Sequence, residues 1–75
     1  MGIDHESSTP LYVQLAGLLR AQIEDGTITK RLPSVKTLSQ EHGVSRITSE
    51  RALTKLKDEG LIVPVIGKGY YVVGT

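Results

Sequence analysis

The sequence predicts a small, mainly α-helical domain that ends in a β-hairpin. Three stretches carry apolar residues at helical spacing, a glycine follows each stretch, and two β-rich runs close the chain. The 75 residues include no Cys, Trp or Phe, so we expect one domain, over residues 9–75, with an aliphatic core. Residues 1–8 are polar and lack periodicity, which predicts a disordered N-terminal tail.

The first helix is predicted to start at Thr9-Pro10, with Thr9 as its N-cap and Pro10 in its first helical position. Leucines then recur at helical spacing up to Ile23, and Gly26 ends the helix. Such a stripe is typical of a core face, so we assign it no chemistry. Thr27 to Leu32 is a connector, long enough for a turn and a two- or three-residue strand.

Pro33-Ser34 starts a second helix, with Ser34 as its N-cap, and Gly43 stops it. Only Gly43-Val44 separates this helix from a third one, which Ser45 caps. The third helix covers residues 45–59 and is followed by Gly60. Two helices joined by so tight a turn predict a helix-turn-helix.

The third helix has two distinct faces at about 100° per residue. Its predicted core face consists of Ser49, Ala52, Leu53 and Leu56. The opposite face mixes basic, polar and apolar residues. It carries Arg46, Ile47, Glu50, Arg51, Thr54 and Lys57. A helix with one buried face and this kind of outer face suits a DNA groove.

Two β-rich runs follow, Leu61 to Ile66 and Tyr70 to Val73, and they predict a hairpin with the basic, glycine-flanked tip Gly67-Lys68-Gly69. Pro64 cannot donate to a strand ladder, so the first strand should be short or lie at an edge. Three helices followed by a two-stranded hairpin is the winged helix-turn-helix layout. In it, the hairpin, or wing, lies beside the recognition helix, and Lys68 would meet the negative potential of a narrow groove.

The charges are segregated along the chain. Residues 1–25 hold four acidic side chains and one basic one, whereas residues 26–57 hold seven basic and two acidic side chains. A basic block beside an acidic one outlines a surface for a polyanion. An ordinary solvated surface is the alternative.

The sequence offers no support for an enzyme, a cofactor or a metal site. No serine has a histidine and an acid at suitable positions, and His42 lacks a second ligand nearby. Gly67-x-Gly69 lacks the third glycine of a dinucleotide loop, and Gly69 stands where a phosphate loop needs Ser or Thr. The longest apolar run is too short to cross a bilayer and no signal-peptide pattern opens the chain, so we expect a soluble, cytoplasmic (nucleoid-associated) protein without membrane contact.

Several motifs follow one another along roughly residues 9 to 73, including Pro10-Leu11-Tyr12-x-Gln14-Leu15, Leu32-Pro33-Ser34, Gly43-Val44-Ser45-Arg46 and Glu59-Gly60-Leu61-Ile62. In this order they resemble the DNA-binding domain of the GntR family of bacterial transcription regulators. The opening motif, around Tyr12 and Gln14, is similar to the HutC-like and YtrA-like branches.

The resemblance implies a homodimer that binds a palindromic operator in double-stranded DNA, as a repressor. Helix 45–59 would enter the major groove, and the wing tip 67–69 would reach the adjacent minor groove. The isolated domain could be monomeric and dimerise only on DNA. A small-molecule effector would act only through a C-terminal domain, which we expect to be absent from this chain.

The expected DNA contacts form two groups, one that positions the duplex and one that faces bases. The positioning residues, held against phosphates, are Lys36, Ser45, Thr48 and Lys68. The base-facing residues are Arg46, Ile47, Glu50 and Arg51, where Ile47 could pack on a thymine methyl. Ser34 and the wing glycine Gly69 complete the contacting set.

The chain departs from the family pattern at two of these positions. Lys36 replaces an arginine, which keeps the charge and loses the bidentate fork. Glu50 stands where arginine is usual. It could accept a hydrogen bond from cytosine or pair with Arg46 one turn earlier, and we favour the pairing. The apolar run 63–66 also predicts a wing with a smaller electrostatic contribution.

Two other functions stay open. A winged helix can serve as a protein-protein interaction module, which predicts weak, salt-insensitive DNA binding. It could also bind structured RNA, although the narrow major groove of A-form RNA does not admit a helix.

Overall fold

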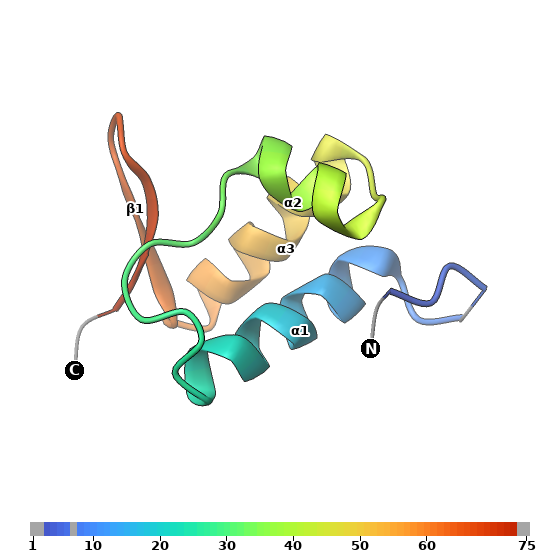
Figure 1. The fold of residues 1–75 in the computed structure, drawn as a ribbon, viewed down its shortest axis with the longest axis horizontal. Coiled ribbons are helices and arrows are strands. Elements are labelled where there is room, and N and C mark those ends of the chain that lie inside the picture. The colour runs from blue at the N-terminus through green and yellow to red at the C-terminus, as the bar shows by residue number, and fades with distance from the viewer. Residues whose placement is uncertain (1–2, 7, 74–75) are drawn as a thin grey trace.

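The computed structural model describes residues 3–6 and 8–73. It contains three helices and a hairpin in the predicted order: α1 Leu11–Glu24, α2 Val35–His42, α3 Arg46–Asp58, β1 Ile62–Val65 and β2 Gly69–Val72. The helix α3 packs against α1, α2 and β1, and Figure 1 shows it between the other two helices, with the hairpin standing at one end. The predicted three-helix domain with a two-stranded wing is therefore confirmed.

The core is aliphatic, as the composition predicts. Its buried members are Leu15, Ala16, Leu19, Leu32, Leu38, Val44, Ala52, Leu53, Leu56 and Ile62. The predicted inner face of α3 is buried along its whole length. Ser49 on that face is fully buried, and its hydroxyl donates to the backbone oxygen of Ser45 at 3.2 Å, which satisfies the polar group. This face fixes α3 in rotation and thereby decides which side chains point outward.

Four of the predicted helix ends are confirmed. Thr37 N–H donates to Ser34 Oγ at 3.2 Å, and Thr48 N–H donates to Ser45 Oγ at 3.1 Å, so both serines are N-caps. Gly43 (φ 63°) and Gly60 (φ 80°) supply the left-handed residues that follow α2 and α3.

The start of α1 differs from the prediction. Pro10 has an extended backbone (ψ 143°) and takes the N-cap position itself, so the helix begins at Leu11. The Pro10 carbonyl accepts from the N–H groups of Val13 at 3.1 Å and Gln14 at 3.2 Å. The expectation of Thr9 as N-cap and Pro10 as the first helical residue is therefore wrong by one position.

Residues 3–6 lie against the start of α1. Gln14 accepts from Asp4 N–H at 2.7 Å through Oε1 and donates from Nε2 to Asp4 O at 2.9 Å. Ile3 packs partly against the core. One side-chain amide therefore satisfies both backbone groups of Asp4, and the disorder expected for residues 1–8 stays a prediction. Residues 1–2 and 7 of the expected tail lie outside the described residues.

The wing is an antiparallel pair in which Ile62 faces Val72 and Pro64 faces Tyr70. On its other side β2 contacts the connector, where Arg31 bridges to Tyr71. The predicted connector strand is thus reduced to a single bridge. Tyr70 O and Val72 N–H bond to the connector, so the Pro64 nitrogen points away from β2 and breaks no ladder bond.

None of the described helices combines the length and the apolar character that crossing a bilayer requires.

Candidate nucleic-acid interface

The turn between α2 and α3 is fixed by a side chain of α2. The Ser39 hydroxyl donates to Val44 O, and Val44 N–H donates back to Ser39 O at 3.2 Å. Val44 itself is buried, with 7% of its surface exposed. This pinned turn sets the direction in which α3 leaves α2, which is the geometric requirement for a recognition helix.

The outer face of α3 is exposed as predicted. Arg46, Glu50 and Arg51 are exposed, and Ile47 has 63% of its surface accessible. An apolar side chain this open on a polar helix face is able to contact another molecule. Thr48 is half-buried because it closes the N-cap.

The hydroxyls of the two N-cap serines are already used within the chain. Ser34 Oγ donates to Thr37 Oγ1 at 3.0 Å, and Ser45 Oγ donates to Thr48 Oγ1 at 3.0 Å. Each threonine can then direct its own O–H outward, because a hydroxyl has one donor and two acceptor positions. Thr37 is not among the residues predicted from the sequence, although the repeat Ser-x-x-Thr places it at the start of α2 as Thr48 is placed at the start of α3.

Glu50 and Arg46 do not form the pairing that the sequence analysis favours. Among the described residues, the ion pairs involve only Glu59, with Arg20 and Lys55. An exposed pair one turn apart contributes only about 0.3–0.5 kcal/mol, and less when the cation precedes the acid. Lys55 and Glu59 do pair at this spacing, but there Arg20 already holds the carboxylate. The Glu50 carboxylate is therefore available to solvent or to a ligand.

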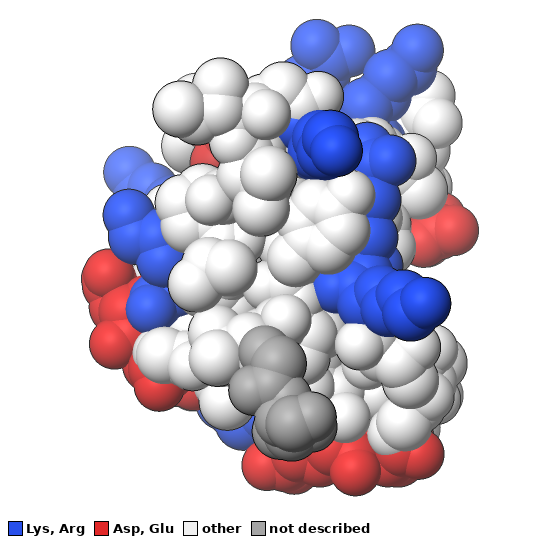
Figure 2. Space-filling view, turned by 90° about the vertical axis from the view of Figure 1, so that its left-hand side faces the viewer, with Lys and Arg blue, Asp and Glu red and all other residues white. Residues whose placement is uncertain are grey.

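Basic side chains gather around one end of the molecule. Figure 2 looks at the wing side, and there Lys and Arg border the uncharged wing surface along the top and on both sides. Most of the Asp and Glu in this view lie along the bottom and the lower left margin, and a further acidic group lies on the right margin beside basic side chains. On this face the upper part is mainly basic and the lower edge mainly acidic, which favours approach of a polyanion to the upper part.

The wing tip lies beside the start of α2. A recess of about 310 Å³ between them is lined by Ser34, Lys68, Gly69 and Arg31, among others. Lys68 is exposed, and its N–H donates to Val65 O at 3.0 Å, which closes the tip. The structure therefore brings together Ser34, Lys68 and Gly69, whereas Lys36 is exposed on α2 outside this recess.

The outer wing strand is apolar at the surface. Val63 and Val65 are 44% and 37% exposed, and Ile66 at the tip is fully exposed. This strand therefore adds no charge to the surface of the wing. Lys68 is the basic residue of the tip.

No described residues form a group of three or more His, Cys, Asp or Glu side chains able to hold a metal ion. Asp25 and Glu59 have carboxyl groups with a lowered pKa, and neither residue is among the predicted DNA contacts. A hydrogen bond from Thr27 lowers the pKa of Asp25, and a hydrogen bond from Arg20 lowers the pKa of Glu59.

Known proteins share both this sequence pattern and this fold. NagR of Bacillus subtilis, a transcriptional repressor, is 35% identical over 74 residues, which cover 96% of this chain and 30% of NagR. YtrA from Sulfolobus acidocaldarius superposes with a TM-score of 0.86 at 37% identity, covering 97% of this chain and 79% of YtrA. The DNA-binding domain of AraR, solved in complex with operator ORX1, gives a TM-score of 0.83 at 32% identity, covering 97% of this chain and 90% of that domain.

The chain spans less than a third of the length of NagR and of two other curated relatives that it matches. Its match to the family described as "Bacterial regulatory proteins, gntR family" extends over residues 11–72, and thus over all three helices and the wing. The chain belongs to the gntR family of bacterial regulatory proteins.

Proposed function

We propose that this chain is the sequence-specific DNA-binding domain of a bacterial transcription repressor. The observation that carries the proposal is the outer face of α3, which is exposed, carries Arg46 and Arg51, and is directed by a pinned turn. AraR supports it, since its DNA-binding domain has this fold and was solved on its operator. In this mode α3 enters the major groove and the wing tip reaches the neighbouring minor groove.

The contacts divide into positioning and reading. Lys36, Lys68 and the hydroxyl pairs at the two N-caps hold phosphates, and Gly69 lets the wing backbone come close to the duplex. Arg46, Glu50 and Arg51 face base edges. Ile47, with its open apolar surface, packs on a thymine methyl group, a contact that accounts for an exposed isoleucine on a reading face.

The proposed assembly is a homodimer on a palindromic operator. Two copies reading two half-sites double the base contacts of so small a domain, and the half-site spacing then follows the two-fold symmetry. A small-molecule effector would act through a part of the regulator outside this chain, since the relatives are more than three times as long. We place the protein in the cytoplasm at the nucleoid, and we assign it neither catalysis nor a cofactor.

Selection of bound sequences from a random duplex pool tests DNA binding, palindromy and half-site spacing together. We expect one enriched motif, which is repeated as an inverted pair if the dimer forms on DNA. Binding to this duplex should weaken steeply with added salt, because phosphate contacts release counterions. A protein-interaction module would enrich no motif. Duplex RNA that displaces the selected DNA from the protein would support the RNA-binding alternative.

Arg46→Ala gives the residue-level test on the selected duplex. We expect a loss of about 1–3 kcal/mol of specific binding free energy at fixed salt, as for a good base contact. Arg46→Lys is the matched control, because it keeps the charge and removes only the bidentate fork. It should retain binding to random duplex while losing preference for the selected one. Wild-type affinity of Arg46→Ala for the selected duplex would refute the docking of α3.

A further inference from the structure

We propose that Arg31 is a further DNA-contacting residue, which together with Lys68 clamps a backbone phosphate between the connector and the wing tip. The inference rests on the proposed function and adds to it a residue outside both helices of the helix-turn-helix. It concerns how the duplex is gripped beside the wing, and it assigns Arg31 no part in reading bases.

The backbone of Arg31 is held in place on both sides. Leu32 N–H donates to Tyr70 O at 3.0 Å, and Val72 N–H donates to Lys30 O at 2.7 Å. Arg31 sits between these two bonds, bridged to Tyr71. Its side chain therefore starts from a fixed point on the wing, although the residue belongs to a connector in the sequence.

The guanidinium group lies against the wing tip. A Cβ atom built on Gly69 would be 3.8 Å from Arg31 Nε and 3.9 Å from Nη2, which is ordinary van der Waals contact. The side chain thus runs along the backbone of Gly69 while the residue stays exposed to solvent. A planar fork in this position offers its remaining N–H groups to a ligand that touches the tip.

Arg31 and Lys68 line the same recess and lack an acidic counterpart there. No Asp or Glu is among the residues that line it. In the described part of the chain, neither cation takes part in an ion pair. Two like charges that converge on one recess repel each other, and an anion between them removes that repulsion.

A duplex phosphate is the anion that fits this place. The recess lies at the wing tip, where the proposed docking brings the sugar-phosphate backbone that borders the minor groove. Phosphate oxygens accept bidentate hydrogen bonds from an arginine fork, and a lysine ammonium adds a compact second charge. The clamp would therefore hold the wing in register with α3.

The test measures affinity for the selected duplex over a series of salt concentrations. Removing one phosphate contact makes the slope of log K against log[salt] shallower by about 0.9. For Arg31→Gln we expect this change, with an affinity lower by about fivefold and an unaltered preference among duplex sequences. Arg31→Lys should restore the slope, since it restores the charge.

Lys30→Gln is the matched control, because it removes the same charge one residue away. Neighbouring side chains of an extended segment point to opposite sides, so Lys30 does not reach the recess and its variant should keep the wild-type slope. Thermal unfolding of each variant shows whether the substitution destabilises the fold, which distinguishes a structural role of the side chain from a DNA contact. A wild-type slope for Arg31→Gln, with or without a lower melting temperature, would overturn the inference, as would equal slopes for the Arg31 and Lys30 variants.

Failure of this inference is distinct from failure of the proposed function. If the selection enriches no duplex, or if Arg46→Ala binds the selected duplex like the wild type, the proposed function is wrong and the clamp falls with it. If Arg46→Ala weakens binding while Arg31→Gln keeps the wild-type slope, only the clamp is wrong.

Discussion

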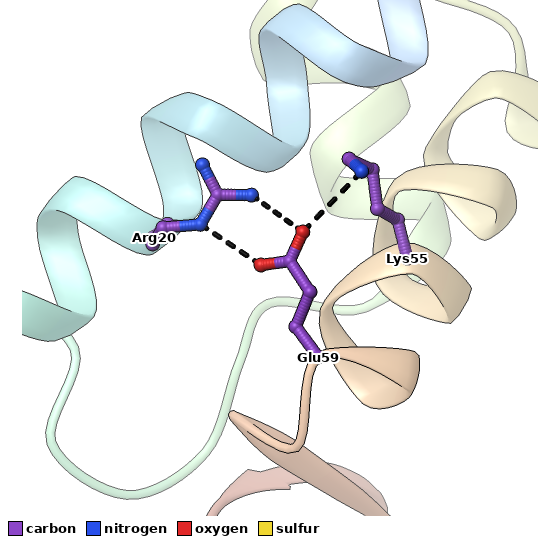
Figure 3. A network of polar contacts seen from close by, with 3 residues as sticks. All are labelled: Arg20, Lys55 and Glu59. Carbon is purple, nitrogen blue, oxygen red and sulfur yellow. Dashed lines mark hydrogen bonds and ion pairs between the residues drawn. The ribbon is translucent and has the colours of Figure 1, made fainter.

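Arg20 on α1 and Glu59 at the end of α3 form a two-point ion pair. Arg20 Nε donates to Glu59 Oε1 at 2.9 Å, and Arg20 Nη2 donates to Oε2 at 2.8 Å (Figure 3). Lys55 Nζ lies 3.3 Å from Oε2 on the same carboxylate. Because β1 starts at Ile62, this contact ties α1 to the junction between the recognition helix and the wing.

Loss of the Arg20 fork should destabilise that junction. We expect Arg20→Ala to lower the midpoint of urea unfolding, and Arg20→Lys to recover part of it, because the ammonium keeps the charge without the two-point geometry. Both side chains are about one-third exposed, so solvent screening limits the effect. A midpoint for Arg20→Lys equal to that of Arg20→Ala would show that charge contributes nothing here.

Acid should weaken the fold through the same carboxylate. The pKa of Glu59 lies below its ordinary value of 4.5, first because of the hydrogen bond from Arg20. A lowered folded-state pKa means that the stabilisation is complete above 4.5 and is lost as the pH falls through the folded-state value. Urea midpoints measured across this window should therefore fall less for Glu59→Gln than for the wild type. Parallel pH profiles would contradict the linkage.

The effects of Ser45 on stability and on DNA binding should be separable by substitution. Ser45→Ala is expected to cost about 1 kcal/mol of unfolding free energy, because Thr48 N–H loses its acceptor. Ser45→Asp keeps an acceptor and should unfold like the wild type. It nevertheless adds a negative charge beside the expected phosphate, so its affinity for duplex DNA should fall. Equal DNA affinity for Ser45→Asp and wild type would place Ser45 away from the duplex.

Glu50 is the position where a substitution should gain affinity. Since no ion pair joins it to Arg46, Glu50→Arg removes one repulsive charge and adds a cation on the reading face. We expect tighter binding to random duplex and a salt slope steeper by about 0.9 or more. Glu41→Arg, at the C-terminal end of α2, makes the same charge change elsewhere. If the two variants have similar salt slopes, Glu50 is an ordinary surface charge with no special position toward the duplex.

Two glycines should respond to alanine in opposite directions. Gly17 lies in α1 with nothing within 4 Å of a built Cβ, so Gly17→Ala should stabilise the fold by about 0.5–1 kcal/mol. Gly69 has φ 102°, and Gly69→Ala should cost about 1–3 kcal/mol of backbone strain despite the available space. Urea unfolding measures both changes, and a stabilising Gly69→Ala would contradict the need for that backbone conformation.

The sequence by itself determined the three helices, the caps of α2 and α3, and the buried face of α3. These features are local: a serine oxygen bonds an N–H three residues on, and Gly43 and Gly60 adopt conformations that most residues avoid. The winged-helix order followed from them, and so did the set of side chains on the outer face of the recognition helix. The exact start of α1 did not follow from the sequence, because proline fits both the N-cap position and the first helical position.

Only the tertiary structure decided which distant residues meet. The bond between Asp4 and Gln14, the ion pair of Arg20 with Glu59 and the position of Arg31 over Gly69 join separate segments. Each depends on how the helices and wing pack, and that packing is set by buried apolar surface, which is non-directional and specifies no polar partner. The unpaired Glu50 has a different reason. One helical turn brings Arg46 within reach, but the free energy of an exposed pair is too small to hold it there.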